Sequence, residues 1–394
     1  MKNNNLENNI WKIAASNAFR QLALNGAVYI LFFNYLGFNF NDIGLIEAIT
    51  SLAILIVELP SGIFADRVGR KWAVVVSRIF WLIYLLVQSY CDGSYLILVV
   101  IGLTSGLEYG FQSGASSALL YDTMKELGRE DDFTRVNGRI KAIITILGIG
   151  AMIIGAYLFS INPRLPYRIL SVSTVISILF MLSVEETVKP SDKIDFWHQV
   201  DEMKNSVRTV FKNRSLLWLS IFFFVPAVLD ESYWDVYSQA HLTQAGLDPV
   251  FIGGVFAVFS VIKAITSYYV NEIEKKLGYS GSLYAIVVSN AVIFLILGYV
   301  SSWKTLMIVL VFSTVSRNFL WLVEETYKNR VIPSESRASI LSAISFLNNG
   351  LFGGALIIWG YGWAIDNLST HSTFLLSGAL ICILGLLIRR KFLH

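Results

Sequence analysis

The sequence has few charged residues and little of the chemistry that soluble enzymes use. Only 15% of its 394 residues are Asp, Glu, Lys or Arg, whereas soluble domains carry roughly 25%. Its two cysteines, Cys91 and Cys382, lie far apart in the chain, which favours neither a disulfide framework nor a metal site. The net charge of +3 gives no support to nucleic-acid binding.

Catalytic and nucleotide-binding motifs are also missing. All four histidines fall outside the long apolar segments, and no Ser-His-Asp or metal-ligand spacing occurs. No P-loop is present, so the chain does not itself couple ATP hydrolysis. We therefore expect neither an enzyme nor a cofactor.

Apolar residues make up 55% of the chain and occur in long blocks. The blocks are about 18 to 25 residues long, enough to cross roughly 30 Å of hydrocarbon as a helix. Twelve transmembrane helices are predicted near residues 13–37, 42–65, 72–91, 94–120, 138–160, 166–184, 215–240, 250–271, 280–300, 303–324, 338–364 and 372–389.

Lys and Arg are distributed unevenly between alternate loops. If both termini are cytoplasmic, 25 of the 31 basic residues fall in cytoplasmic segments, and only Arg164, Arg168 and Lys304 fall in outer loops. Cytoplasmic loops of membrane proteins carry this excess of positive charge. The pattern predicts a multi-pass membrane protein with both termini in the cytoplasm.

The longest polar segment, about residues 185–214, divides the helices six and six. It predicts an N-terminal bundle over 1–184 and a C-terminal bundle over 215–394. Within this linker, apolar residues recur at helical spacing among charges, at Trp197, Val200, Met203, Val207, Val210 and Phe211. Either a helix lying on the membrane surface or a solvated linker with chance periodicity fits this pattern.

The loop after the second helix carries the most specific motif of the chain. It reads Gly62-Ile-Phe-Ala-Asp66-Arg67-Val-Gly69-Arg70-Lys71. Glycine permits a tight turn, a carboxylate can cap a helix, and basic residues hold the loop on the cytoplasmic side. A Gly, an Asp four residues later and then Gly-Arg-Lys resembles the signature loop of the major facilitator superfamily.

The resemblance implies a fold and a mechanism. It implies two six-helix bundles that rock around a central site, so that a monomer in the bacterial cytoplasmic membrane works by alternating access. In that family, the residues matching Asp66 and Arg70 latch the bundles together when the site faces outward. The corresponding segment after the eighth helix, 271–279, lacks the strict acid position, so no latch is expected there.

Ionisable and polar residues inside the spans are site candidates, because such residues cost several kcal/mol unless paired or hydrated. In the family, the first helix of each three-helix unit lines the central cavity. The candidates for substrate binding or proton coupling are Arg20, Glu108, Gln112, Asp230, Glu231, Trp234, Asp235, Lys263 and Arg317.

The charges predict specific pairs. We expect Arg20 to pair with Glu108. Asp230 or Glu231 should interact with a base of the C-terminal bundle, and that base is Lys263 or Arg317. Four mid-membrane acids against three bases leave at least one acid to exchange a proton.

The fourth helix also carries glycines every four residues, at Gly102, Gly106, Gly110 and Gly114. Such a stripe predicts close packing against a neighbouring helix. At 100° per residue it lies opposite Glu108, which should therefore face the cavity.

These features favour a proton-coupled exporter of amphipathic or cationic compounds, with Trp234 as the best aromatic contact. Drug exporters of the superfamily often carry an Arg in helix 4 and a Gly-Pro turn in helix 5, whereas this chain has Glu108 and glycines without proline. Two alternatives stay open. They are a proton-coupled uptake symporter or facilitator for a small polar solute, and a lipid-handling protein such as a lysolipid flippase.

Overall fold

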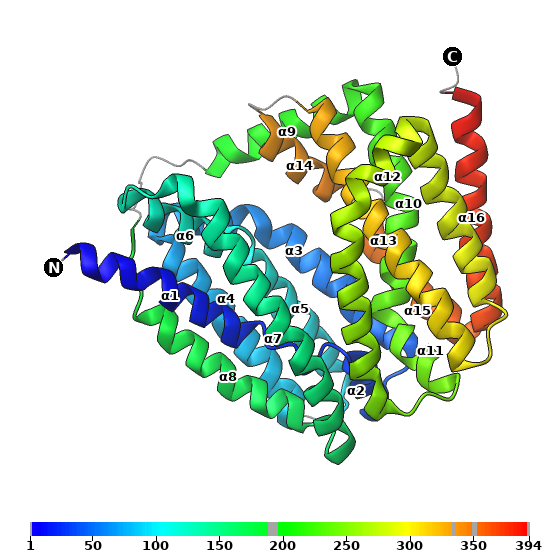
Figure 1. The fold of residues 1–394 in the computed structure, drawn as a ribbon, viewed down its shortest axis with the longest axis horizontal. Helices are drawn as coiled ribbons and strands as arrows, with labels where there is room; N and C mark the ends of the chain where they lie inside the picture. Colours follow the sequence, from blue (N-terminus) through cyan, green and yellow to red (C-terminus); the bar gives the residue numbers. More distant parts are fainter. Residues whose placement is uncertain (1, 91, 188–195, 333–335, 349–352, 392–394) are drawn as a thin grey trace. The chain divides into compact units, whose positions relative to one another are not determined.

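The computed structural model describes residues 2–90, 92–187, 196–332, 336–348 and 353–391. Within these ranges the chain is helical and contains no strand (Figure 1). Eight of the described helices are long and apolar enough to cross a membrane. The predicted all-α membrane class is confirmed. Cys382 is a free, exposed thiol, and Cys91 lies outside the described residues.

Packing divides the chain into two units. Unit 1 comprises Met1–Leu36 and Ile49–Asp201, and unit 2 comprises Gly37–Ala48 and Glu202–His394. The division falls inside one long helix, α3 (Phe40–Val68). Residues 37–48, which the sequence assigned to the N-terminal bundle, therefore pack with unit 2. The predicted boundaries at residues 184 and 214 stay predictions.

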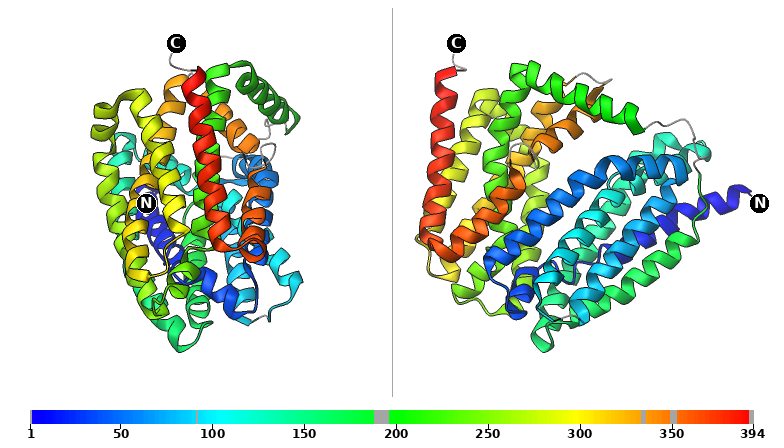
Figure 2. Two further views of the ribbon diagram at one scale, coloured as in Figure 1. Left: turned by 90° about the vertical axis from the view of Figure 1, so that its right-hand side faces the viewer. Right: turned by 180° about the vertical axis from the view of Figure 1, so that it is seen from behind.

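Unit 1 contains most of α3 together with seven α-helices and one short 3-10 helix. They are α1 (Lys2–Arg20), α2 (Tyr29–Tyr35), α4 (Arg70–Tyr90), α5 (Tyr95–Gln112), α6 (Ala115–Glu126), η1 (Glu130–Asp132), α7 (Phe133–Ile161) and α8 (Leu165–Leu182). Helix α1 lies beside α8, which in turn lies beside α4 (Figure 2).

Two predicted spans of unit 1 are each built from two helices. The first span is interrupted between Arg20 and Tyr29, and the fourth is interrupted at Ser113 and Gly114. Gly114 adopts φ 75°, which a residue with a side chain rarely adopts. Irregular backbone at membrane depth is tolerated only where protein buries it or water reaches it. Both breaks lie next to polar side chains described below.

The glycines of the fourth span have two structural roles, close packing against α3 and the end of a helix. A Cβ on Gly106 would overlap the α3 backbone at Thr50, and a Cβ on Gly110 would overlap Val57. Close packing against a neighbouring helix is confirmed at these two positions. Gly114 has nothing within 4 Å of its Cβ position, so the prediction of packing there is wrong, and this glycine ends a helix instead.

Unit 2 contains the remaining helices. They are α9 (Phe196–Lys212, whose first turns fall in the range of unit 1), α10 (Arg214–Val236), α11 (Ser238–Gln244), α12 (Pro249–Leu297), α13 (Trp303–Val331), α14 (Arg337–Phe346), α15 (Gly354–Asn367) and α16 (Thr370–Lys391). Helix α12 is two helices joined at a kink, where Gly278 has φ 66° and ψ −179°. Its two arms match the predicted eighth and ninth spans.

The first residues of α3 are held by α15 within unit 2. The main-chain N–H of Asn41 donates to the Asp366 carboxylate at 2.7 Å. A Cβ on Gly362 would overlap the main-chain oxygen of Phe40. The two helices therefore cross backbone to backbone at this glycine.

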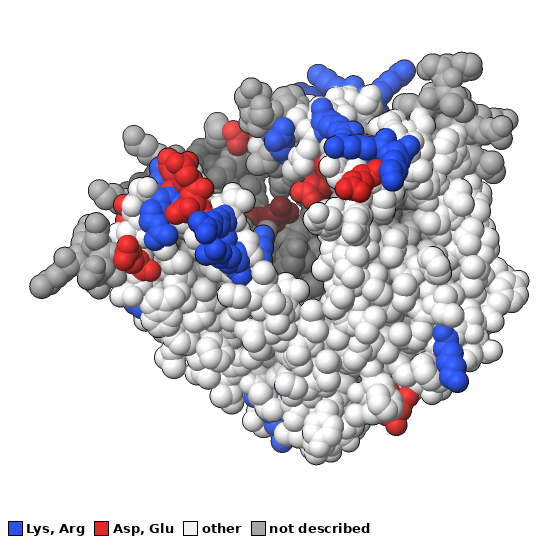
Figure 3. All heavy atoms as spheres, in the orientation of Figure 1, with Lys and Arg blue, Asp and Glu red and all other residues white. Residues whose placement is uncertain are grey.

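The charged residues of α12 gather just before its kink, at Glu272, Glu274, Lys275 and Lys276, and Lys263 is the one other charge of this helix. Figure 3 shows charged side chains along one edge of the molecule and a largely uncharged surface below them. Many apolar side chains of the spanning helices are exposed in both units, among them Ile146 and Tyr157 in unit 1 and Tyr268 and Ile308 in unit 2. In water such surfaces would be unfavourable, whereas hydrocarbon solvates them.

Candidate functional site

A polar cluster lies inside unit 1, where α1 ends beside α5. Arg20 donates from Nε and Nη2 to Glu108 Oε1 at 3.0 and 2.6 Å. The two side chains are 16% and 5% exposed. The Arg20 guanidinium also lies 3.8 Å from the centre of the Trp81 ring. The predicted ion pair between Arg20 and Glu108 is present, held between a carboxylate and an aromatic face.

A second arginine, which the sequence analysis misplaced, completes this cluster. Arg78 falls inside the predicted third span, 72–91, yet it was counted among the 25 basic residues of the cytoplasmic segments; α4 begins at Arg70 and places Arg78 two turns inside. Its side chain is fully buried. It donates to Gln112 Oε1 at 2.7 Å and to Asn17 Oδ1 at 2.9 Å, and it lies 3.9 Å from Glu108.

Neutral polar groups connect the cluster to the break in the fourth span. The Asn17 amide donates to Ser116 Oγ at 2.9 Å, and Ser116 is the second residue of α6, two residues after Gly114. The cluster therefore has two guanidinium groups and one carboxylate, Glu108, joined by amide and hydroxyl groups. Such a surplus of one positive charge suits a polar or anionic group of a ligand.

The cluster of unit 2 has the opposite charge balance. Asp230 is buried in α10, and its carboxylate lies 3.0 Å from Arg317 Nε on α13. Glu231 and Asp235 on α10 also lie within electrostatic range of Arg317. Of the two bases proposed as the partner of an α10 acid, Arg317 is therefore the one in contact. Arg317 thus pairs with Asp230 and has two further carboxyl groups within electrostatic range.

An aromatic wall borders this cluster. The Arg317 guanidinium lies 5.5 Å from the centre of the Trp234 ring, within the range of a cation–π contact. Trp234 is 8% exposed, and its ring packs edge to face against Phe256 and Phe259. Trp234 is thus fixed by its neighbours beside the charged groups.

The sequence interpretation included Lys263, which is not the partner of Asp230, and left out Glu324, which is buried and paired. The Lys263 side chain is exposed on α12, and the Asp230 partner is Arg317 instead. Glu324, left out of the candidate list, is 7% exposed and forms a buried ion pair with Lys328. It also lies within electrostatic range of Glu231. The i, i+4 spacing of Glu324 and Lys328 was the available signal.

The signature loop is held within unit 1. Gly69, with φ 126°, separates α3 from α4. Arg70 pairs with Asp122 of α6 at 2.5 Å. The main-chain N–H of Lys71 donates to the Glu186 carboxylate at 2.9 Å, so Glu186 caps the N-terminus of α4.

The other residues of the motif lie at the end of α3. Gly62 and Arg67 are exposed, and Asp66 is half-buried. The latch role that the resemblance implies for Asp66 and Arg70 stays a prediction, because the contacts described here join the loop to its own unit. Asp122 and Glu186 are the partners that sequence reasoning missed.

A similar arrangement with reversed charges occurs in unit 2. Gly278 marks the kink of α12, and the buried Glu274 lies one turn before it. Tyr327 donates to Glu274 Oε1 at 3.1 Å, and Arg330 pairs with the same oxygen at 3.1 Å. The segment therefore has a buried, paired acid, although one residue farther from the glycine than Asp66 lies from Gly69.

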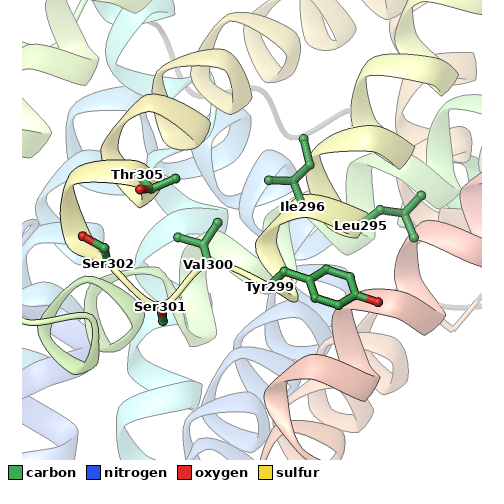
Figure 4. Close-up of a pocket in the computed structure, with 7 residues that line it drawn as sticks. All are labelled: Leu295, Ile296, Tyr299, Val300, Ser301, Ser302 and Thr305. Atoms are coloured by element: carbon green, nitrogen blue, oxygen red, sulfur yellow. The ribbon is translucent and has the colours of Figure 1, made fainter.

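Two hollows of unit 2 lie apart from the charged cluster. One, of about 450 Å³, lies at the turn between α12 and α13, where its lining includes Tyr299, Ser301, Ser302 and Thr305 (Figure 4). The other, of about 390 Å³, is an apolar groove between the two arms of α12 and α13. Neither lining contains a carboxylate or a basic side chain.

The family model of the Major Facilitator Superfamily matches residues 11–356. The chain belongs to the major facilitator superfamily. As a member of this superfamily, the chain is a multi-pass membrane transporter of a small-molecule substrate and not an enzyme.

Relatives and solved structures agree with this assignment. The Bacillus subtilis (strain 168) protein named uncharacterized MFS-type transporter YxaM is 26% identical over 66% of this chain and 66% of its own length, slightly under two thirds. The multidrug efflux protein YfmO of the same organism is 25% identical over 84% of this chain and 80% of its own length. The crystal structure of the nucleoside transporter NupG superposes with a TM-score of 0.80 at 16% identity, covering 99% of this chain and 100% of that one.

Proposed function

We propose that this transporter exports amphipathic or cationic compounds in exchange for protons, by alternating access. The observation that carries the proposal is the cluster of unit 2, in which Asp230 pairs with Arg317 while Glu231 and Asp235 lie within electrostatic range of the same base. Two negative charges in excess at membrane depth are unfavourable unless something neutralises them.

Protons and an organic cation are two ways to neutralise the same carboxyl groups. A cation bound beside Glu231 or Asp235 favours their ionised forms, whereas a bound proton removes the charge that attracts the cation. Because the two ligands compete for one cluster, loading one releases the other, which is the thermodynamic requirement for exchange. Trp234 adds an apolar, polarisable wall for the organic part of such a compound.

The other parts of the proposal rest on the family and the sequence. YfmO carries the name multidrug efflux protein, which supports export. The uneven distribution of Lys and Arg supports the bacterial cytoplasmic membrane with both termini inside. Arg20, Glu108 and Gln112 of unit 1 are proposed to take part in substrate binding or proton coupling. We propose a monomer.

One observation favours a second candidate, proton-coupled uptake of a small polar solute. The cluster of unit 1 offers two guanidinium groups and the amides of Asn17 and Gln112, which are hydrogen-bonding groups suited to hydroxyl or carboxylate groups of a solute. The surplus of positive charge in this cluster does not attract a cationic amphiphile.

Transport in proteoliposomes separates the two candidates. The protein is reconstituted with an outward or inward pH gradient, and the flux of a fluorescent organic cation is compared with that of labelled sugars and nucleosides. Export by exchange predicts that the cation moves in the direction opposite to the flow of protons. This cation flux should be abolished in Glu231→Gln and in Asp235→Asn. Glu272→Gln, which neutralises an exposed carboxylate of α12 in the same unit, is the matched control.

Two outcomes would overturn the proposal. Cation flux that is the same in Glu231→Gln, Asp235→Asn and the unaltered protein would remove the coupling role of these acids. Flux of a sugar or nucleoside in the direction of the proton gradient, with no flux of the cation, would replace export by uptake.

A further inference from the structure

The linker helix α9 has one face fixed against unit 2. Val210 is buried in an apolar cluster with residues from α10, α13 and α14, and Met203 and Val207 pack against the same cluster. Ser206, on the same side, is 8% exposed. Three of the six periodic apolar residues of the linker therefore contact the protein itself, and the sequence had left a helix on the membrane surface and a solvated linker both open.

A second face of α9 is exposed and has a different composition. Trp197 is 69% exposed and Phe211 is 45% exposed. At 100° per residue, these two aromatic residues and the exposed Lys204 and Arg208 fall within an arc of roughly 60°. Exposed Lys212 lies at the edge of this arc. We call these five residues the basic–aromatic face.

The position of α9 in the chain brings this face close to a membrane-spanning helix. Lys212 ends α9, and Asn213 caps the next helix, α10, by accepting a hydrogen bond from the Leu216 N–H at 3.1 Å. Arg214, the first residue of α10, is also exposed. A single residue thus separates the linker helix from a segment that crosses the bilayer.

We propose that the basic–aromatic face of α9 binds the anionic headgroup surface of the membrane. Tryptophan prefers the boundary between headgroups and hydrocarbon, and lysine and arginine next to a spanning segment are attracted by anionic lipid. Asp201 is the one acidic residue of α9 that lies within this face, between Arg208 and Lys212, so three basic groups outnumber one acidic group and the face is complementary to a negative surface. Met203, Val207 and Val210 hold α9 on unit 2, and this packing fixes the orientation of the basic–aromatic face.

The experiment uses the full chain in lipid nanodiscs. Both cysteines are replaced, and a polarity-sensitive fluorophore is attached at Asn205→Cys, an exposed position at the rim of the face. Discs of phosphatidylcholine alone are compared with discs that also contain phosphatidylglycerol. The proposal predicts a blue-shifted emission only in the discs with anionic lipid, and loss of the shift at high salt.

Charge variants test the residues. Replacing Lys204, Arg208 and Lys212 together by Gln is expected to weaken the association of the helix with anionic lipid by roughly a hundred-fold. Replacing the same residues by the other basic type keeps the charge and should retain the shift. A Lys275→Gln, Lys276→Gln double variant, which neutralises exposed bases elsewhere in unit 2, is the control.

Two results would overturn the proposal. The first is equal emission in the two kinds of disc, which would be the result if the face serves a soluble protein or only solvent. The second is a full shift in the triple Gln variant with unchanged thermal stability. The test needs no transport measurement, so its outcome is independent of the proposed substrate and coupling.

Discussion

Neutralising Glu108 is the most informative perturbation of unit 1. Its carboxylate is shared by Arg20, at 2.6 and 3.0 Å, and by Arg78, at 3.9 Å. Glu108→Gln keeps the shape and one acceptor oxygen but leaves two guanidinium groups without a counter-charge. Because Arg78 is fully buried, water does not compensate for the loss.

The magnitude follows from burial and geometry. Breaking a buried ion pair by removing one partner costs about 3–5 kcal/mol. The amide oxygen of Gln still accepts a hydrogen bond, and Arg20 still stacks on Trp81, so we expect the lower end, about 3 kcal/mol. For a unit of this size, 1 kcal/mol shifts the melting temperature by roughly 2–4 °C, so we expect a loss of roughly 6–12 °C.

Thermal melting of the purified protein, followed by tryptophan fluorescence, measures this loss. Glu126→Gln, which neutralises an exposed carboxylate of α6 in the same unit, should shift the melting temperature by no more than about 2 °C. The double variant Arg20→Gln, Glu108→Gln should melt above the single Glu108→Gln, since only one uncompensated arginine remains. A Glu108→Gln protein that melts like the unaltered protein, or a double variant whose losses simply add, would refute this reasoning.

Three further predictions use separate contacts. A Cβ on Gly155 of α7 would overlap the main chain of Leu24, whereas Gly150 of the same helix has open space; Gly155→Ala should therefore lower the melting temperature by several degrees and Gly150→Ala should not, and equal effects would contradict this packing. The Arg70 and Asp122 side chains are about a quarter exposed, so a double-mutant cycle measured by denaturant unfolding should give a coupling free energy for the pair of only about 0.5–1 kcal/mol. A value above about 3 kcal/mol would contradict this prediction, because it is typical of a fully buried pair. Burial lowers the pKa of His241, in α11 beyond the spanning helix α10, to about 4. Because the unfolded chain takes up a proton near pH 6.5 and the folded chain does not, the free energy of unfolding should fall between pH 6.5 and 4 by at most about 1.4 kcal/mol per pH unit. His241→Gln should make the melting temperature depend less on pH in this range, and an unchanged dependence would contradict the prediction.

Helix positions were largely predictable because membrane solvation imposes a simple rule on the sequence. Each predicted span lies on one helix or on two consecutive helices, since the backbone must satisfy its hydrogen bonds within the segment. Interruptions were less visible. The break at Gly114 looked like the end of a packing stripe, because a glycine that packs and a glycine that adopts positive φ are the same residue in a sequence.

The ion pairs were predictable only where the candidates were few. Arg20 had one mid-membrane acid within its bundle, and the pair with Glu108 followed. Arg78 was missed because it lies near the basic signature loop, where the number of positive charges, rather than their depth, decided the assignment. Asp230 had two candidate bases, and the choice of Arg317 depended on how α10 faces α13, which a sequence pattern does not give.

The linker shows a third kind of limit. The periodicity of Met203, Val207 and Val210 fitted either an amphipathic helix or chance periodicity in a solvated linker, and α9 is a helix with one apolar face packed on protein. Periodicity identifies an apolar face but does not say whether protein or lipid covers it. Only the packing against α14 decides that protein does.

The most direct test of the central claim, that the acid surplus of unit 2 exchanges protons for a cationic substrate, is proton release on substrate binding. The purified protein is held in weakly buffered solution with a pH indicator, and an organic cation is added without any pH gradient. The account predicts that the solution acidifies in proportion to bound cation, and that this signal is lost in Glu231→Gln, Asp235→Asn. Cation binding with no change in pH, or an equal proton release from that double variant, would contradict it.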